Sequence, residues 1–168
     1  MKRLAAVVIS FAAVGIFTVP AVASDADGNH EAYFWAVATD TSMAPDGSTI
    51  TLRGHGTLTA GPDKAVTGGG TFTDSARASG TWTATAIDGF VSYGLAGTEP
   101  FPLPPGAAGG QAKLRVALSD GRTGVLTIFC ILGTPPPSVM EGVTLVLGSG
   151  VSGEYTTEVS GNTIFIAL

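Results

Sequence analysis

Cysteine and histidine are scarce in this chain of 168 residues, which contains one cysteine and two histidines. A single cysteine excludes an intrachain disulfide, and two separated histidines do not make a zinc site. We therefore expect no metal ion and no cofactor. Cys130 lies in the apolar run Leu126–Leu132, where burial disfavours the reactive thiolate and blocks access to it. It is predicted to be a small core side chain.

The residue patterns of common catalytic sites are also absent. The chain has no Gly-x-Ser-x-Gly elbow, no His-Glu-x-x-His pair and no Cys-x-x-Cys. Residues 148–153 match the dinucleotide-binding pattern literally, but a strand is expected after them, where that motif needs a helix N-terminus to hold the pyrophosphate. We predict no catalytic residues. A cofactor-free barrel enzyme acting on a small apolar substrate is the alternative, because carboxylates distant in sequence can converge in a fold.

Charged residues make up only 12% of the chain, against 45% apolar residues. The net charge is −5, and it becomes −7 when Lys2 and Arg3 are removed with the N-terminal segment considered next. An acidic chain excludes a nucleic-acid surface, which needs clustered Lys and Arg side chains. The apolar content is too high for a disordered protein.

The first 23 residues have the pattern of a secretory signal peptide. Lys2 and Arg3 precede an apolar run that is too short to stop in a membrane and that ends in small residues. Cleavage is expected between Ala23 and Ser24. We predict a secreted protein with no membrane association after cleavage, whose mature chain begins with a flexible segment at residues 24–31.

The remainder, residues 32–168, is expected to form a single β domain. No stretch of ten or more residues has helical spacing of its apolar side chains. The short separations between strands favour an antiparallel up-and-down meander, most simply a closed or nearly closed soluble β-barrel of about eight to ten strands, with a β-sandwich as the alternative. Strands are expected at 32–39, 49–59, 64–73, 78–87, 90–95, 111–119, 122–132, 142–148, 153–159 and 162–167.

Interior glycines share one face of the three expected strands between residues 49 and 87. They indicate close curvature around Trp82 and Phe72, because a glycine in a strand needs something to pack over it. Keeping the apolar faces together aligns Gly56, Gly68 and Trp82 across these strands, and beside them Gly54, Gly70 and Gly80.

A second hairpin surrounds Asp120 and Gly121. A three-residue loop with Gly121 in a left-handed bulge pairs Leu114 with Leu126, which keeps the more apolar face together. This register turns Cys130 toward the core.

The long connections indicate where a ligand could bind. Successive connections in an up-and-down path lie at alternate ends, so the loops 40–48, 74–77, 94–110 and 133–141 are expected at one end. Loop 94–110 is long and proline-rich, and such loops are often functional. The acidic residues expected at this end are Asp40, Asp46, Asp74, Glu99 and Glu141. The candidate ligand-binding residues are Trp82, Tyr93 and Phe101.

We interpret the chain as a non-enzymatic binding or interaction module that meets a small apolar ligand or a protein partner at this long-loop end. A further alternative is an ice-binding surface, because threonines on adjacent strands resemble the array on antifreeze proteins. Arg53, His55 and Gly69 interrupt that array. Its threonines lie in the segments 49–51, 57–59, 71–73 and 81–85.

Three segments carry a resemblance to known sequences. Val66–Thr73, with its Gly-Gly-Gly-Thr-Phe, is followed by Gly80–Ala84, with its Gly-Thr-Trp, and by Ser92–Gly94. Together they resemble uncharacterised secreted bacterial proteins of no known activity. The resemblance implies an exported bacterial protein and supplies no functional residue.

Overall fold

The computed structural model of the chain describes residues 32–97, 102–148 and 153–168. The predicted signal peptide and residues 24–31 lie outside these ranges, as do Glu99 and the candidate ligand residue Phe101. The described residues form strands and no helix, which confirms the all-β prediction. They accordingly contain no helix with the length and hydropathy to cross a membrane.

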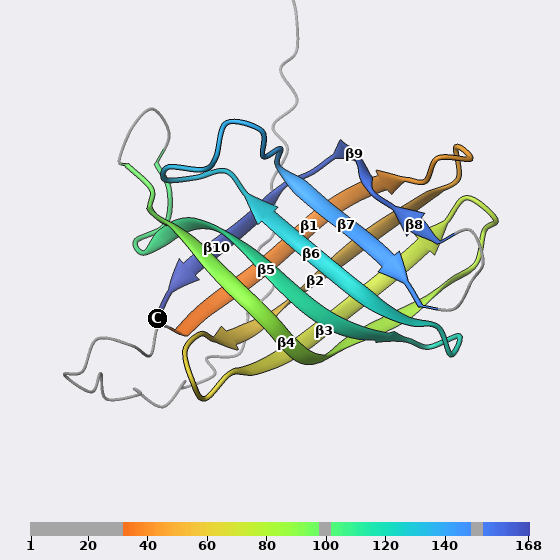
Figure 1. Cartoon of the computed structure of the whole chain (residues 1–168), viewed down its shortest axis with the longest axis horizontal. Helices are drawn as coiled ribbons and strands as arrows, with labels where there is room; N and C mark the ends of the chain where they lie inside the picture. The colour runs from red at the N-terminus through yellow and green to blue at the C-terminus, as the bar shows by residue number, and fades with distance from the viewer. Residues whose placement is uncertain (1–31, 98–101, 149–152) are drawn as a thin grey trace, which may run out of the picture.

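Ten strands form one antiparallel sheet in the described part of the chain (Figure 1). Neighbours in sequence pair with one another from the first strand to the eighth, as expected for an up-and-down meander. The strands are β1 (Ala32–Met43), β2 (Thr49–Thr59), β3 (Ala65–Asp74), β4 (Ser79–Leu95), β5 (Ala107–Leu118), β6 (Thr123–Cys130), β7 (Gly142–Leu147), β8 (Glu154–Tyr155), β9 (Thr157–Ser160) and β10 (Thr163–Ala167).

The last strand closes a ring of six strands. β10 pairs along the first half of β1, from Tyr33 to Val37, and also pairs with the start of β5 through Phe165 and Ile166. The ring is therefore β10-β1-β2-β3-β4-β5, while β6, β7 and β8 continue outward from β5. β9 pairs with the second half of β1.

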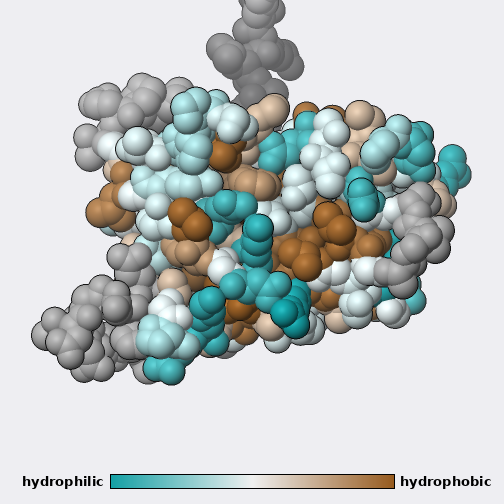
Figure 2. Space-filling view, viewed as in Figure 1, coloured by the Kyte–Doolittle hydropathy of each residue, from teal (hydrophilic) through white to brown (hydrophobic). Residues whose placement is uncertain are grey.

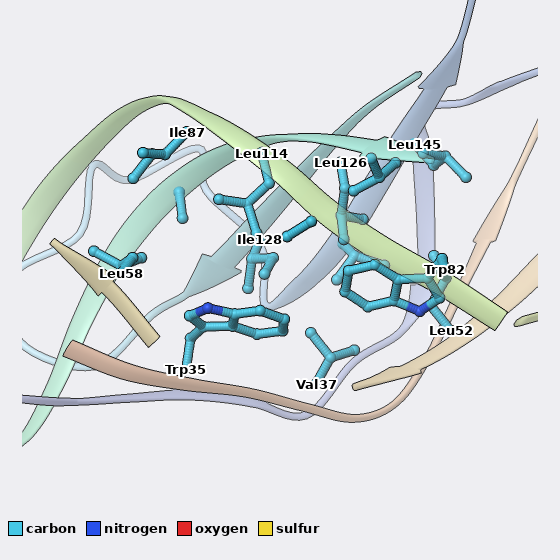
Figure 3. Close-up of a cluster of buried hydrophobic side chains, with 14 of the residues drawn as sticks. Trp35, Val37, Leu52, Leu58, Trp82, Ile87, Leu114, Leu126, Ile128 and Leu145 are labelled. Atoms are coloured by element: carbon cyan, nitrogen blue, oxygen red, sulfur yellow. The ribbon is translucent and has the colours of Figure 1, made fainter. Parts of the chain in front are cut away.

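The core lies between two sets of strands that cross. In Figure 1, β5, β6 and β7 pass in front of β1, β2 and β3 and run across their direction. Large side chains from both sets are buried together (Figure 3), and each contributes about 1.5–3 kcal/mol by leaving water. The largest are Trp35, Trp82, Phe72, Phe165, Ile50, Leu52, Leu58, Leu114, Leu126, Ile128 and Leu145.

Two tryptophans occupy the centre of this core. The rings of Trp35 and Trp82 are stacked with centroids 5.8 Å apart and an interplanar angle of 24° (Figure 3). The indole N–H of Trp82 donates a 3.0 Å hydrogen bond to the carbonyl of Arg53. Trp82 is 2% exposed, so its side chain belongs to the core.

The glycines of β2 leave room for these two indoles, which the sequence predicts for Trp82 but not for Trp35. A Cβ atom on Gly54 would lie 2.6 Å from the Cζ2 atom of Trp82, and one on Gly56 would lie 2.7 Å from Cζ2 of Trp35. Real Cβ atoms do not approach other atoms this closely. Any larger residue at either position would displace an indole or a strand.

The registers expected for β2 with β3 and for β5 with β6 are confirmed, but that of β3 with β4 is shifted by two residues. Trp82 lies opposite Gly70 and not Gly68. The turn between these strands includes Arg77 at φ 68°, whose N–H bonds to the Asp74 carbonyl. A shift of two keeps every side chain on its face, so the apolar pattern does not distinguish the two registers.

The strands expected at 78–87 and 90–95 are one continuous strand, β4. Asp88 and Gly89 form no turn, because β4 stays paired with β5 through bulges such as the one between Ile87 and Gly89. The carboxylate of Asp88 bonds to the side chain of Arg115 at 2.8 Å, and its carbonyl accepts a 3.1 Å hydrogen bond from Lys64 Nζ.

Because one strand stands where two were expected, every later connection lies at the end opposite to the expected one. The connection after β4 is therefore opposite the turns at 44–48 and 75–78, and the prediction that loops 40–48, 74–77, 94–110 and 133–141 share one end is wrong. The turns after β3 and after β5 do meet, because the Nη2 atom of Arg122 lies 3.3 Å from Asp74 and 2.6 Å from Asp120. The described residues that follow β4 and β6 share the other end, where the N–H of Thr134 bonds to the carbonyl of Tyr93.

Candidate functional site

An apolar groove lies at the end of the ring where β1 begins, β4 ends, β5 begins and β10 ends. Its volume is about 320 Å³. Leu95 and Leu168 at its border are 67% and 70% exposed, although both are large apolar side chains. The described lining consists of Ala32, Tyr33, Ser92, Gly94, Leu95, Ala108, Ala167 and Leu168, none of which has a charged side chain.

Aromatic rings in mutual contact support the groove from inside. Tyr33, which lines the groove, lies 4.6 Å from the ring of Phe90, measured between centroids. Phe90 in turn meets Phe165 at 5.2 Å in an edge-to-face arrangement. Tyr33 and Phe165 are buried, so these three rings form a rigid apolar floor at this end.

A second groove of about 430 Å³ adjoins the first and shares Leu95 with it. Proline fixes the shape of its wall, and the N–H of Ala107 bonds to the carbonyl of Pro104 at 3.0 Å. Gly106 has φ 78° and a Cβ atom there would lie 2.8 Å from the carbonyl oxygen of Ala167. The described lining consists of Leu95, Ala96, Gly97, Pro102, Leu103, Pro104, Pro105, Gly106 and Ala107.

Of the three candidate ligand residues, Tyr93 is the one that the structure places near these grooves. Its neighbours Ser92 and Gly94 line the first groove. The Tyr93 side chain itself is 9% exposed, and burial raises the pKa of its hydroxyl. Trp82 lies in the core and Phe101 is outside the described residues. The described lining of the second groove belongs to loop 94–110, which the sequence indicated. The lining residues near the two ends of the domain, such as Ala32 and Ala167, were missed because small residues carry no sequence signal for binding.

Figure 2 shows the surface character at this end. Apolar surface lies at the left of the molecule, where β4 ends and β5 begins, and a second apolar area lies over β6 and β7. The second area belongs to the outer face of the sheet, where Val146 on β7 is 41% exposed and pairs with Val125 on β6. The end of the ring differs from this outer face because it contains the two grooves, whose described lining includes no residue of β6 or β7.

A separate cluster of three carboxylates lies where β1 changes its partner from β10 to β9. Asp40 is fully buried at a bulge in β1, and its Oδ1 atom accepts a 2.8 Å hydrogen bond from the N–H of Asn162. Its Oδ2 atom is buried without a hydrogen-bond partner. Glu141 Oε1 accepts a 2.8 Å hydrogen bond from the N–H of Thr163. Glu158, on β9, is the third member and is half-buried.

The environment of this cluster disfavours negative charge. Burial raises the pKa of Asp40 to about 6, and Glu141 adds to the rise, although the hydrogen bond from Asn162 opposes it. Burial also raises the pKa of Glu158 to about 7, with further contributions from Glu141 and Asp40. Two of the three carboxyls therefore take up protons near neutral pH.

The sequence brought together only part of this cluster. Asp40 and Glu141 do meet, but not through the shared loop end that the sequence predicted, and Asp46 and Asp74 lie apart from them. Asp46 is exposed in the β1–β2 turn, and hydrogen bonds from Ser48 lower its pKa. Asp74 is paired with Arg122. Glu158 was not anticipated, because nothing in its local sequence indicates which distant residues it faces.

The described residues contain no group of three or more His, Cys, Asp or Glu side chains arranged to hold a metal ion. Cys130 is fully buried, as expected, and burial raises the pKa of its thiol. Several outward threonines bond to one another across strands, with hydroxyl oxygens 2.9 Å apart in Thr41 and Thr51 and 2.8 Å apart in Thr57 and Thr67. Comparisons with protein-family models, curated proteins and solved structures found no match to this chain.

Proposed function

We propose that this protein is a secreted, non-enzymatic binding module that takes up a small, neutral, apolar molecule at the end of its strand ring. The observation that carries the proposal is the first groove, in which the exposed side chains of Leu95 and Leu168 border a lining without charged side chains above an aromatic floor. The signal-peptide pattern of residues 1–23 supports the secreted location.

The size of the two adjoining grooves suits a small molecule. Small-molecule sites typically have volumes of about 300–1,000 Å³ and mostly apolar linings. Each groove, at about 320 and 430 Å³, lies at the lower end of that range, and Leu95 joins them. An apolar occupant would cover side chains that otherwise stay in water.

The chemistry of the lining favours binding over catalysis. Catalysis needs a titratable group within hydrogen-bond reach of the reacting atoms. The carboxyls of raised pKa, Asp40 and Glu158, are not among the described residues lining either groove. The described lining is mostly apolar, and it includes two residues with hydroxyl groups, Tyr33 and Ser92.

A fluorescence titration with Nile red, a neutral apolar dye, tests the proposal. The variant carrying Leu95→Ser and Leu168→Ser should bind the dye about tenfold more weakly, because losing part of each leucine's burial costs about 1.4 kcal/mol in total. Val159→Ser is the matched control, since Val159 is a 56% exposed apolar residue on β9 outside both grooves. Equal affinity in wild type and double variant, or no binding by the wild type, would overturn the proposal.

A further inference from the structure

The contact between β1 and the C-terminal strands is built around the fully buried carboxyl group of Asp40. A bulge between Val37 and Asp40 shifts the register of β1 against β2. Up to Val37, β1 pairs with β10, and from Thr41 onward it pairs with β9. Asp40 thus sits at the branch point, where the carbonyl of Asn162 also accepts a 3.0 Å hydrogen bond from the N–H of Ala38.

Two glycines lie beside this carboxyl group and leave no room for a larger residue at Gly161. A Cβ atom on Gly161 would lie 2.6 Å from Asp40 Oδ1. One on Gly142 would lie 3.6 Å from the same oxygen and 3.6 Å from Cγ of Glu158. The start of β7 and the β9–β10 connection therefore close over Asp40 and exclude water from it.

Glu141 joins three segments at the same place. Its Oε2 atom accepts a 2.9 Å hydrogen bond from the N–H of Ile131, after β6, and its Oε1 atom accepts the N–H of Thr163, at the start of β10. The hydroxyl of Thr163 lies 2.8 Å from the same Oε1 atom and 2.6 Å from the carbonyl of Phe129. This carboxylate is the fixed anchor of β10.

No cation balances the cluster within the described residues. The ion pairs described there involve Arg115 and Arg122, which bind Asp88, Asp74 and Asp120 elsewhere. Facing Asp40 are Glu141 ahead of β7 and Glu158 on β9, and Cys130 at the end of β6 faces Glu141. β7 and β10 contain no titratable side chain, and the Arg53 and His55 side chains of β2 lie on the face opposite Leu52, which pairs with Asp40.

We propose that Asp40 and Glu158, beside the β10 anchor Glu141, form a pH-dependent clasp that holds β9 and β10 against β1 when these two carboxyls are protonated and loosens the strands when they ionise. The Oδ2 atom of Asp40 is buried and has no hydrogen-bond partner, so its protonation removes the largest desolvation penalty in the cluster. Ionisation of Asp40 and Glu158 places negative charges next to each other and to Glu141, in a space bordered by backbone. The strands can relieve that repulsion only by moving apart and admitting water.

The direction of the effect follows from the pKa values. Those of Asp40 and Glu158 are raised above their ordinary values of 3.8 and 4.5, to about 6 and about 7. A group with a raised pKa binds its proton more tightly in the folded state, so its contribution is fully present at low pH. That contribution is lost as the pH rises through about 6 to 7.

Hydrogen exchange measured by mass spectrometry tests the clasp. Peptides covering residues 154–168 should lose protection by at least about tenfold between about pH 5 and about pH 8, after correction for the intrinsic pH dependence of exchange. The variant Asp40→Asn with Glu158→Gln carries neutral groups of the same shape, so its protection should not change with pH. Asp63→Asn, in the exposed β2–β3 turn, is the control and should behave as wild type.

Two results would overturn the clasp. One is a loss of protection in the double variant equal to that of the wild type. The other is protection of residues 154–168 in the wild type that stays the same between about pH 5 and about pH 8. Should Asp40→Asn fail to fold, Glu158→Gln alone is informative because Glu158 is only half-buried, and it should show a smaller pH-dependent loss than wild type.

Discussion

Substituting Gly56 by alanine tests the packing of the ring most directly. A Cβ atom there would lie 2.0 Å from the backbone carbonyl oxygen of Thr67, 2.7 Å from Trp35 Cζ2 and 2.8 Å from the Cα atom of Gly68. Two of these atoms belong to the backbone of β3, so the added methyl group must push two paired strands apart. We expect Gly56→Ala to lower stability by about 3 kcal/mol, at the upper end of overpacking costs.

Differential scanning calorimetry measures this cost against a matched control. A domain of this size changes its Tm by about 3–4 °C per kcal/mol, so the Tm of Gly56→Ala should fall by about 10 °C. Gly89→Ala in β4 is the control, because a Cβ atom on Gly89 meets nothing within 4 Å and its φ is not in the left-handed region. That variant should be neutral or more stable by up to about 1 kcal/mol.

A third variant separates the two sources of the clash at Gly56. Trimming the indole with Trp35→Phe removes the contact to Cζ2 but leaves the contact to the Thr67 carbonyl. The double variant should therefore show no rescue of Gly56→Ala. If Gly56→Ala lowers the Tm no more than Gly89→Ala does, the requirement for close approach of β2 and β3 is refuted.

Three further outcomes are expected. Wild-type stability in calorimetry should fall between about pH 4 and pH 7. The loss should reach up to about 3 kcal/mol, because burial raises the pKa of Asp40 from 3.8 to about 6, and Asp40→Asn should reduce this dependence on pH. Cys130, which is fully buried with a raised thiol pKa, should react with a thiol reagent in denaturant and not in the native protein. Trp82→Phe should cost about 2–4 kcal/mol in urea unfolding, because it removes buried volume and the hydrogen bond to the Arg53 carbonyl.

Local patterns predicted those parts of the fold that local chemistry decides. The register of β5 with β6 follows from the turn, since Gly121 takes φ 90° and a three-residue loop then pairs Leu114 with Leu126. The glycines of β2 and β3 pair as expected because each strand has one clearly apolar face. Cys130 faces the core for the same reason.

The β4 strand shows where local patterns fail. Asp88-Gly89 is a common hairpin-turn pair, and nothing in the neighbouring sequence distinguishes a turn from a bulge. The tertiary contacts decide it, because Asp88 bonds to Arg115 on β5 and to Lys64 before β3. Because two strands were predicted where there is one, every later loop was predicted at the wrong end. The carboxylate cluster escaped prediction because Asp40, Glu141 and Glu158 meet only through the closure of β9 and β10 on β1.

The strand that closes the ring is among the shortest in the sheet. β10 has five residues, yet it supplies the pairing that joins β1 to β5. Its first residue, Thr163, is held by Glu141, and its last, Ala167, lines the apolar groove. Five extended residues span about 17 Å, so the proposed clasp and the proposed binding groove lie at opposite ends of one rigid element. We therefore expect that weakening the anchor at Thr163 also changes the position of the strand that forms one wall of the groove.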